Sequence, residues 1–375
     1  MRLLSVIGTR PEAVKMAPVL LALAAEPGVD SRLCVTGQHR ELLDDVLRFF
    51  DLAPDVDLDL MTPGQELNAL ISTALHRLDA VLAEIAPDRV IVQGDTSTAY
   101  AAALAAHHRG IPVAHVEAGL RTYAANPWPE EANRRAITLL ADLHLAPTPV
   151  AAANLAAERV RGRIVVTGNS GIDALHMVLA RCDAARDTMP DLPADRRLIL
   201  FTGHRREHFG TPFDGIWSAL REIAKRPDVA ILCSVHPNPR IRDPITVALG
   251  DAANIRLVPP LSLAAFARTL RRADLVLTDS GGVQEEAAAL GRPTLVLRDA
   301  TERNEGIAAG LAVLVGSDPA RIVSATMQWL DRPPFLAPSD VYGDGRAAGR
   351  IVDALLGHAI DEFAPEARDR PTWIG

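Results

Sequence analysis

The chain of 375 residues is 48% hydrophobic and 23% charged, with a formal net charge of -8. Its length exceeds that of one ordinary core and fits two domains. The acidic balance and the aromatic content of 4% disfavour a nucleic-acid partner, because such a partner requires phosphate neutralisation and stacking surfaces.

The first half alternates short β-branched segments with alanine- and leucine-rich amphipathic segments, which indicates βαβ units and the α/β class. The predicted strands are Leu3–Ile7, Arg32–Thr36, Arg89–Gln93, Pro112–Val116, Leu143–Pro147 and Ile164–Thr167. The predicted helices are Pro18–Ala25, Glu41–Phe50, Leu67–Ile85 and Ser97–Arg109.

The pattern restarts after Leu179 to Arg197, a segment rich in Asp, Arg and Pro that we predict to be a linker. The strands predicted after it are Leu198–Thr202, Ile231–Val235, Ile255–Val258, Leu275–Thr278, Thr294–Leu297 and Ala312–Val315. The restart predicts two doubly wound, Rossmann-like domains facing one another across a cleft. Their predicted bounds are 1–178 and 198–345, followed by a helix at 346–359 and a polar tail, 360–375, with little means of packing.

Neither secretion nor a membrane partner is expected. The sequence contains no apolar run near the roughly 20 residues of a membrane span, and the run before Gly8 is shorter than that of a secretory signal. Cys34, Cys182 and Cys233 lack the spacing of a zinc site or a redox pair, so we interpret them as buried or inert thiols. We therefore expect a cytoplasmic protein.

The end of the first strand has the features of an anion site. Gly8 and Thr9 lead into a helix, an order that brings backbone N–H groups and the positive helix end to one point. Arg10 and Lys15 add two positive charges there. Lys15 and Lys225 are the only lysines among 39 basic residues. The alternative for Lys15 is a solvated helix face.

Two acidic residues follow strands of the first half. Asp95 lies in QGDTST, where threonines can cap the next helix, so Asp95 is either a catalytic group or only a cap itself. Glu117 ends the next strand in HVEAGLRT, where burial would suit a carboxyl group to general acid or base work. Its alternative is a structural ion pair with Arg121.

A third acidic site opens a helix in PWPEEANR. Pro129 presets the first turn, and Glu130 and Glu131 complement the positive helix end, so alone they indicate only a helix start. Glu131 becomes a catalytic candidate because two other acidic motifs lie in the same half.

The second half carries a nucleotide-like motif, TDSGGVQEE. Ser280, Gly281 and Gly282 let the backbone approach a diphosphate at a helix start. Glu286, further along that helix, can accept both hydroxyls of a ribose. The Walker ending and the Gly-x-Gly-x-x-Gly pattern are both missing, which disfavours an ATPase and a standard dinucleotide site.

Two histidine motifs also follow strands of the second half. TGHRRE places His204 beside two guanidinium groups, which suits phosphate oxygens; the alternative is a basic surface turn. HPNP contains His236, and its prolines alternatively only shape a loop.

Taken in order, the motifs resemble the non-hydrolysing UDP-N-acetylglucosamine 2-epimerases, which have the glycosyltransferase-B-like architecture. The resemblance runs from about Arg2 to Val315 and rests on GTRPEAVKMAP, TGQHRELL, QGDTST, HVEAGLRT, PWPEEANR, VTGN, TGHRRE, HPNP, TDSGGVQEEA and TER. Each motif is weak alone, whereas the ordered set is specific. It implies a last helix that returns to the first domain and a homodimer.

The resemblance also implies the site residues. Those that would bind the UDP-sugar substrate are Arg10, Lys15, His204, Phe266, Ser280, Gly281, Gly282, Glu286 and Arg303. Those that would be catalytic are Asp95, Glu117, Glu131, His204 and Lys15. The DSGG segment would hold the diphosphate, Glu286 the ribose and the segment ending at Phe266 the uracil, while Arg10 and His204 would close from either side of the cleft.

The implied reaction is reversible conversion of UDP-N-acetylglucosamine to UDP-N-acetylmannosamine for surface polysaccharide synthesis. A base removes the proton at C2 while UDP leaves C1, giving a glycal; UDP then re-adds as a proton returns to the opposite face. Two proton transfers need more than one acid or base, and a departing diphosphate needs cationic and backbone donors. No redox cofactor or metal is required. Asp95 and Glu117 are the candidates for the base.

The chain departs from the family pattern at a few positions. Asn304 stands where many members have Pro. Gln38 and His236 match residues with which some bacterial members bind a second substrate molecule as an activator, whereas Glu41 and Gly64-Gln65 depart from that set. Allosteric activation in that form is therefore disfavoured.

Other functions remain open on the sequence alone. The same fold accommodates a 2-epimerase of a related UDP-sugar, such as a 2,3-diacetamido uronic acid. It also accommodates a glycosyltransferase or a UDP-sugar-binding protein without catalysis. The three acidic motifs favour C2 proton chemistry over plain transfer.

Overall fold

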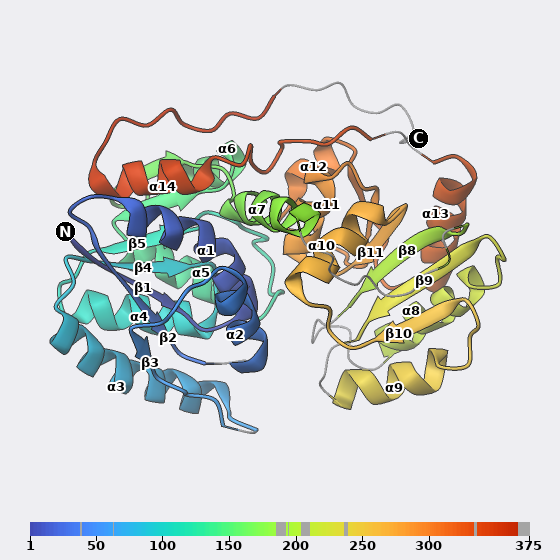
Figure 1. Ribbon diagram of the computed structural model, residues 1–375, viewed down its shortest axis with the longest axis horizontal. Helices are drawn as coiled ribbons and strands as arrows, with labels where there is room; N and C mark the ends of the chain where they lie inside the picture. The colour runs from blue at the N-terminus through green and yellow to red at the C-terminus, as the bar shows by residue number, and fades with distance from the viewer. Residues whose placement is uncertain are drawn as a thin grey trace. The chain divides into compact units, whose positions relative to one another are not determined.

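A computed structural model describes residues 1–37, 40–62, 64–184, 193, 195–203, 211–235, 239–333 and 336–366. The described chain forms two compact units (Figure 1). The first unit contains Met1–Ala174 and Tyr342–Pro365, and the second contains Leu175–Val341 and Glu366. The predicted domain bounds stay a prediction.

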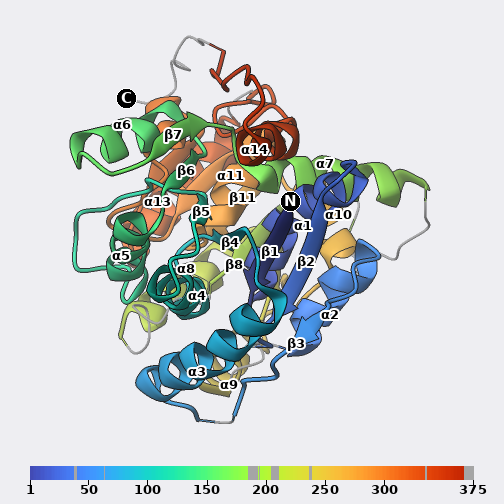
Figure 2. The same cartoon turned by 90° about the vertical axis from the view of Figure 1, so that its left-hand side faces the viewer.

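The first unit is built on a seven-stranded parallel sheet in the order β3-β2-β1-β4-β5-β6-β7. Its strands are β1 (Arg2–Ile7), β2 (Asp30–Val35), β3 (Val56–Asp57), β4 (Arg89–Gln93), β5 (Val113–Val116), β6 (Leu143–Ala146) and β7 (Arg163–Val166). Its helices are α1 (Arg10–Ala25), α2 (Arg40–Phe49), α3 (Leu67–Ile85), α4 (Ser97–His108), α5 (Glu130–Leu140), α6 (Pro149–Ala157) and α14 (Ala347–Leu356), and α7 (Ser170–Ala184) begins in it. Helices cover both faces of the sheet, with α1 and α2 on one face and α3, α4 and α5 on the other (Figure 2).

The second unit is built on a six-stranded parallel sheet in the order β10-β9-β8-β11-β12-β13. Its strands are β8 (Arg197–Thr202), β9 (Val229–Ser234), β10 (Ile255–Val258), β11 (Leu275–Thr278), β12 (Thr294–Val296) and β13 (Ala312–Leu314). Its helices are α8 (Thr211–Ile223), α9 (Pro239–Leu249), α10 (Leu263–Arg272), α11 (Gly281–Ala289), α12 (Asn304–Ala308) and α13 (Pro319–Asp331).

Each sheet reverses its winding direction once, between β1 and β4 in the first unit and between β8 and β11 in the second. In open parallel sheets, ligands bind at the carboxyl ends of the strands beside such a reversal. The predicted fold class of two doubly wound, Rossmann-like sheets is therefore confirmed. Both reversals adjoin strands whose following loops carry predicted site motifs.

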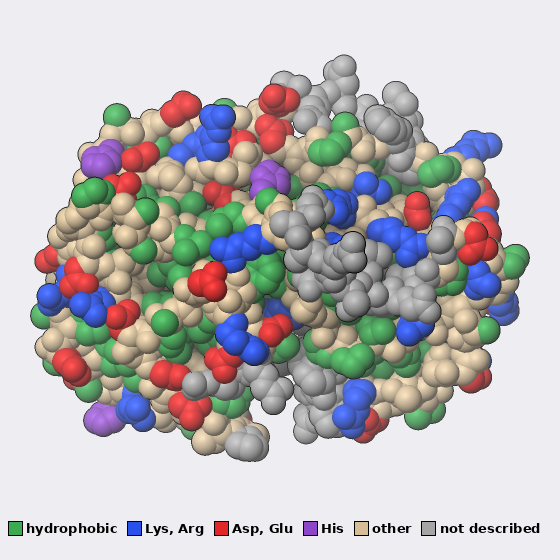
Figure 3. Space-filling model, in the orientation of Figure 1, with side chains coloured by type: hydrophobic (Ala, Val, Ile, Leu, Met, Phe, Trp, Pro, Cys, Tyr) green, Lys and Arg blue, Asp and Glu red, His purple; other side chains and the backbone are tan. Residues whose placement is uncertain are grey.

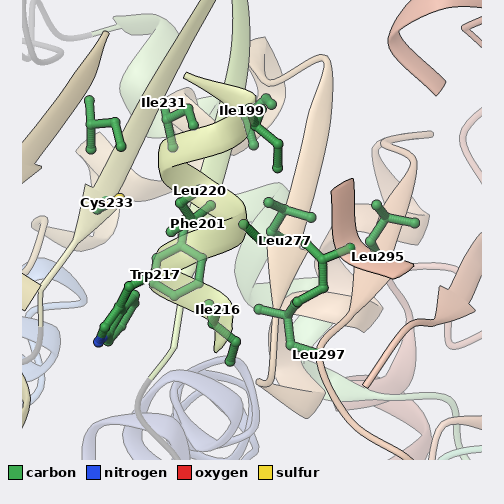
Figure 4. Close-up of a cluster of buried hydrophobic side chains, with 14 of the residues drawn as sticks. Ile199, Phe201, Ile216, Trp217, Leu220, Ile231, Cys233, Leu277, Leu295 and Leu297 are labelled. Atoms are coloured by element: carbon green, nitrogen blue, oxygen red, sulfur yellow. The ribbon is translucent and has the colours of Figure 1, made fainter. Parts of the chain in front are cut away.

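Apolar residues fill the space between each sheet and its helices, because a parallel sheet is buried on both faces. In the second unit Phe201, Trp217 and Leu277 belong to one such cluster (Figure 4). The Trp217 ring stacks on Phe213 with ring centroids 4.8 Å apart. Phe201 and Leu277 lie near the carboxyl ends of β8 and β11, so this packing holds those strand ends in place.

The predicted strands all exist, with ends within two residues of their predicted positions. The two-residue β3 was not predicted, because it is too short to show a pattern. The first helix begins at Arg10 rather than Pro18, since Thr9 and Glu12 form a capping box and Pro11 suits the first turn. The predicted linker is wrong at its start, because α7 continues to Ala184.

The chain returns to the first unit after the second sheet. Helix α14 contacts α1, which confirms the predicted return of the last helix. The Asp173 carboxylate accepts hydrogen bonds from the backbone N–H groups of Ala347 and Ala348 at 3.2 and 2.9 Å. The tail was predicted to pack little, which is wrong for its first residues: Phe363 is buried and donates its N–H to the Val166 carbonyl.

Acidic and basic side chains lie interspersed over the first unit in the view of Figure 3. Several of them are paired, as where Arg32 binds Asp30 and Asp55 at 2.7 and 2.8 Å. Among the described residues, none of the helices combines the length and the apolar character that a bilayer crossing requires.

Candidate active site

The carboxyl ends of β1, β4 and β5 adjoin one another at the first reversal and bring two predicted residues together. Lys15, in the second turn of α1, places its Nζ 2.6 Å from Oε1 of Glu117, which directly follows β5. Gln93, at the end of β4, donates its side-chain amide to the other oxygen of Glu117. The Lys15 and Glu117 side chains are only 11% and 7% exposed. Lys15 therefore does not lie on a solvated helix face.

The alternative pairing of Glu117 with Arg121 is wrong. The Arg121 guanidinium instead donates to both oxygens of Glu158, each at 2.8 Å, and to the hydroxyl of Thr138. Its Nη1 donates to the Leu120 carbonyl at 2.9 Å, so each of the three guanidinium nitrogens donates to a group other than Glu117. Glu117 is thus a partner of Lys15 and Gln93.

Glu117 has a backbone φ of +66°, in the left-handed region that non-glycine residues rarely adopt. Such a conformation costs about 1–3 kcal/mol and is found most often at functional sites. The strain places a carboxylate immediately beyond β5, beside the turn that follows β4. An ideal Cβ on Gly94 of that turn would lie 3.7 Å from Oε2 of Glu117.

A second ionic cluster joins the other two predicted acids. Arg134 of α5 directs Nε and Nη2 to Oδ2 of Asp95, with Nε at 3.0 Å, and directs Nη1 to Oε2 of Glu131 at 3.2 Å. Arg134 is 3% exposed. Sequence reasoning missed it, although it lies in the PWPEEANR motif at the third position after Glu131, where two helix residues face each other.

Asp95 is not the cap of α4. Thr96 caps that helix by accepting a hydrogen bond from the Ala99 N–H at 3.0 Å, as predicted for the threonines of this motif. The Asp95 side chain is 26% exposed, against 7% for Glu117 and 6% for Glu131. Asp95 is therefore the most accessible of the three acids.

Glu131 does more than complement the helix dipole. Its carboxylate accepts hydrogen bonds from the N–H and hydroxyl of Thr122, both at 3.1 Å, and from the N–H of Tyr123 at 3.2 Å. It thereby ties the loop after Glu117 to the start of α5.

The turn that carries Asp95 is held from two further sides. His115 on β5 lies with its Nε2 2.6 Å from the Gly94 carbonyl, and Asn133 donates its amide to the Asp95 carbonyl at 2.9 Å. Burial lowers the pKa of His115 to about 3. The imidazole is therefore neutral, and its Nε2–H is the donor to Gly94.

The anion site predicted at the start of α1 is already filled by the chain itself. The Glu12 carboxylate accepts hydrogen bonds from the N–H of Gly8 at 3.0 Å and of Thr9 at 2.8 Å, and Thr96 donates its hydroxyl to the other oxygen at 2.8 Å. Burial raises the pKa of Glu12 to about 7, against the opposing effect of these donors. Sequence reasoning missed this role, although the Thr9–Glu12 spacing is that of a capping box. Arg10 lies half-buried at the first position of the helix.

In the second unit, the residues of α11 itself place no acidic side chain at the start of that helix. Ser280 is the N-cap residue, but its side chain makes no capping hydrogen bond, and the first turn of α11 contains no acidic residue. A Cβ on Gly282 would meet no atom within 4 Å. Glu286 lies half-buried on the same helix, and Phe266 of α10 is partly buried against a core cluster that includes Val283 and Ala287 of α11.

Arg303 lies against the start of α11, within an internal ion-pair network. Its Nε binds Glu285 at 2.8 Å and its Nη1 binds Glu302 at 2.6 Å, and Arg298 binds the same Glu302 at 3.0 Å. A Cβ on Gly281 would lie 2.8 Å from Cζ of Arg303, so Gly281 leaves room for the guanidinium. The predicted contact of Arg303 with substrate stays a prediction.

Three predicted residues, Gln38, His204 and His236, lie outside the described residues. Within the described ranges, no group of three or more His, Cys, Asp or Glu residues is placed to hold a metal ion. Cys34, Cys182 and Cys233 are all buried and free, as predicted.

Comparisons with known proteins agree with the resemblance. A family model described as UDP-N-acetylglucosamine 2-epimerase matches residues 21–356. The UDP-N-acetylglucosamine 2-epimerase of Escherichia coli (strain K12) is 46% identical over 374 residues, covering 96% of this chain and 100% of the relative. A crystal structure of UDP-GlcNAc 2-epimerase from Neisseria meningitidis bound to UDP-GlcNAc has a TM-score of 0.93 at 41% identity, covering 96% of this chain and 100% of that one.

The likeness in fold reaches further than the likeness in sequence. The spinosyn rhamnosyltransferase SpnG has a TM-score of 0.55 at 18% identity, covering 95% of this chain and 96% of that one. At this identity the match concerns the fold alone, and it relates the two Rossmann-like units to the glycosyltransferase-B-like architecture.

Proposed function

Because this chain belongs to the UDP-N-acetylglucosamine 2-epimerase family, a family of isomerases, we propose that it interconverts UDP-N-acetylglucosamine and UDP-N-acetylmannosamine. The reaction inverts C2 by elimination of UDP to a glycal and re-addition of UDP. The first unit carries the proton transfers and the second unit holds UDP.

The observation that carries the proposal is the bonding of Asp95. Nε and Nη2 of Arg134 both donate to Oδ2 of Asp95, and no described residue donates a hydrogen bond to Oδ1. A partly exposed carboxylate with one uncommitted oxygen is suited to accept or return a proton. In the proposed reaction Asp95 transfers a proton at one face of C2.

The second proton-transfer group is the Lys15–Glu117 pair. It lies at the neighbouring strand end, and its strained backbone fixes the Glu117 carboxylate beside the Asp95 turn. Two such groups on adjacent strands match the need for two proton transfers. Glu131 and His204 complete the proposed catalytic set.

UDP binding is assigned to the start of α11. Ser280, Gly281 and Gly282 present backbone N–H groups at the positive helix end, and no acidic side chain competes there in the first turn. Glu286 is proposed to bind the ribose and the segment ending at Phe266 the uracil. Arg10, His204 and Arg303 are proposed to contact the substrate as well.

Proton NMR in deuterated water tests the proposal. Purified protein is incubated with UDP-N-acetylglucosamine, and the C2 epimer is expected to form with deuterium at C2, because the proton removed exchanges with solvent. Binding without exchange, or sugar transfer to an acceptor without epimer formation, contradicts the proposal.

We also propose a cytoplasmic location and a homodimer. Free, buried cysteines are usual where thiols stay reduced, which supports the location. The dimer rests on the family resemblance. Analytical ultracentrifugation tests it, and a monomer at micromolar concentration contradicts it.

A further inference from the structure

We propose that Arg134 is a positioning residue that holds Asp95 and Glu131 as one unit and leaves Oδ1 of Asp95 available for proton transfer. The proposal rests on the function assigned above. It concerns a residue that sequence reasoning did not single out.

The contacts of Arg134 converge on the two acids. Nε and Nη2 approach a single oxygen of Asp95, rather than spanning both of its oxygens, and Nη1 reaches Glu131. The usual fork arrangement of a guanidinium would engage both carboxylate oxygens. The observed one therefore fixes the Asp95 side chain without consuming Oδ1.

The link extends to the main chain on both sides. Asp95 is anchored after β4, while Glu131 accepts the N–H groups of Thr122 and Tyr123 in the loop after β5. Arg134 thus connects the two loops that follow neighbouring strands. Its own position is set by α5, the same helix in which the neighbouring Asn133 donates its side-chain amide to the Asp95 carbonyl.

Burial makes the connection rigid and specific for arginine. Arg134 is 3% exposed, so its charge depends on the two carboxylates for stabilisation. A planar guanidinium reaches two acids at once through fixed N–H directions, whereas a lysine ammonium is a single point charge on a flexible stem. Lysine at this position keeps the charge and loses the geometry.

Arg121 provides a matched control. It is also 3% exposed and also in the first unit, and it binds one carboxylate, that of Glu158, together with Thr138. None of its side-chain bonds reaches Asp95, Glu117 or Glu131. Arg134→Lys and Arg121→Lys therefore impose similar structural losses, the first on a side chain bonded to two of the acids and the second on a side chain bonded to none of them.

The experiment measures kcat, KM, thermal unfolding and UDP affinity for wild type and both variants. For Arg134→Lys we expect kcat to fall about 100-fold, because a displacement of about 1 Å of a reacting group costs that much. KM and UDP affinity are expected to stay within about threefold, since UDP is assigned to the second unit. For Arg121→Lys we expect a comparable loss of thermal stability and a kcat within about threefold of wild type.

Arg134→Gln is measured alongside, so that the proposal stays testable if the lysine variant does not fold. An amide keeps no charge, and we expect a kcat at least as low as that of the lysine variant. Equal kcat losses at positions 121 and 134, or a kcat near wild type in either Arg134 variant, overturn the assignment. A wild-type protein that does not epimerise overturns the proposed function itself.

Discussion

The turns from β1 to α1 and from β11 to α11 adjoin the two sheet reversals. Both have the order strand, glycine and helix, but they differ in whether a side chain occupies the helix start. The start of α1 is closed by Glu12, whose carboxylate receives the N–H groups of Gly8 and Thr9. The start of α11 has neither an acidic first turn nor a capping side chain from Ser280. A strand, a glycine and a helix therefore do not by themselves make an anion site; the residues of the first turn decide whether it is open.

The charged groups beside the two turns differ in how far their side chains are exposed. Around the first reversal, Asp95 stays 26% exposed although Arg134 binds it. Beside α11, the pairs of Arg303 with Glu285 and Glu302 have side chains no more than 7% exposed. The first arrangement leaves accessible the carboxylate proposed for proton transfer, while the second holds the helix that is proposed to receive the diphosphate.

The largest expected effect comes from Asp95→Asn, which tests whether proton chemistry belongs to the first unit. We expect kcat to fall by about 1,000-fold, the usual contribution of a general acid or base. UDP affinity should be unchanged, because UDP is assigned to the second unit. Asp142→Asn is the control: its half-exposed carboxylate pairs with Arg89 and accepts the Val113 N–H, so this variant should lose some thermal stability and keep its turnover. Steady-state kinetics and calorimetry measure both quantities. Wild-type turnover in Asp95→Asn would remove the main difference drawn between the units.

The next effect comes from Lys15→Met, which removes the charge facing Glu117 and keeps the buried stem. We expect kcat to fall about 100-fold as the second proton-transfer pair is lost. The buried Glu117 carboxylate then lacks its cation, so the free energy of unfolding should fall by about 3 kcal/mol. Activity and denaturant unfolding are both measured, with Lys225→Met as the exposed lysine control. Unchanged turnover would leave the Lys15 pair a purely structural one.

Much of this comparison was predictable from the sequence, and its limits have physical causes. Strands and their ends follow from apolar runs, so the strand-end positions of Asp95, Glu117 and Ser280 were predicted. Partners across the fold were not, since Arg134 reaches Asp95 across 39 residues of chain. Pairing of Glu117 with Lys15 rather than with nearby Arg121 is likewise decided by which helix lies over the strand end.

Gly282→Ala tests the start of α11, to which UDP binding is assigned. A Cβ there meets no atom within 4 Å, so the fold should tolerate it, whereas it occupies space next to the proposed diphosphate. We expect UDP affinity to fall about 10-fold with no loss of thermal stability. Gly349→Ala in α14 is the matched control, because its Cβ also meets nothing within 4 Å. Gly281→Ala, by contrast, should destabilise the protein, as its Cβ would contact Arg303.

The last effect is confined to stability and concerns the closed turn. The folded-state pKa of Glu12 is about 7, above its ordinary value of 4.5, so between these pH values the folded state binds more protons than the unfolded state. The free energy of unfolding should therefore decrease as the pH rises from 4.5 to 7, by at most about 3 kcal/mol, and level off above 7. Glu12→Gln cannot ionise and should lack this decrease, while its amide oxygen still accepts the N–H groups of Gly8 and Thr9. Urea unfolding at pH 5 and pH 8 measures the slope in both proteins. An identical slope in the two would mean that the donors around Glu12 keep it ionised throughout, and the α1 turn would then be closed by a permanent charge.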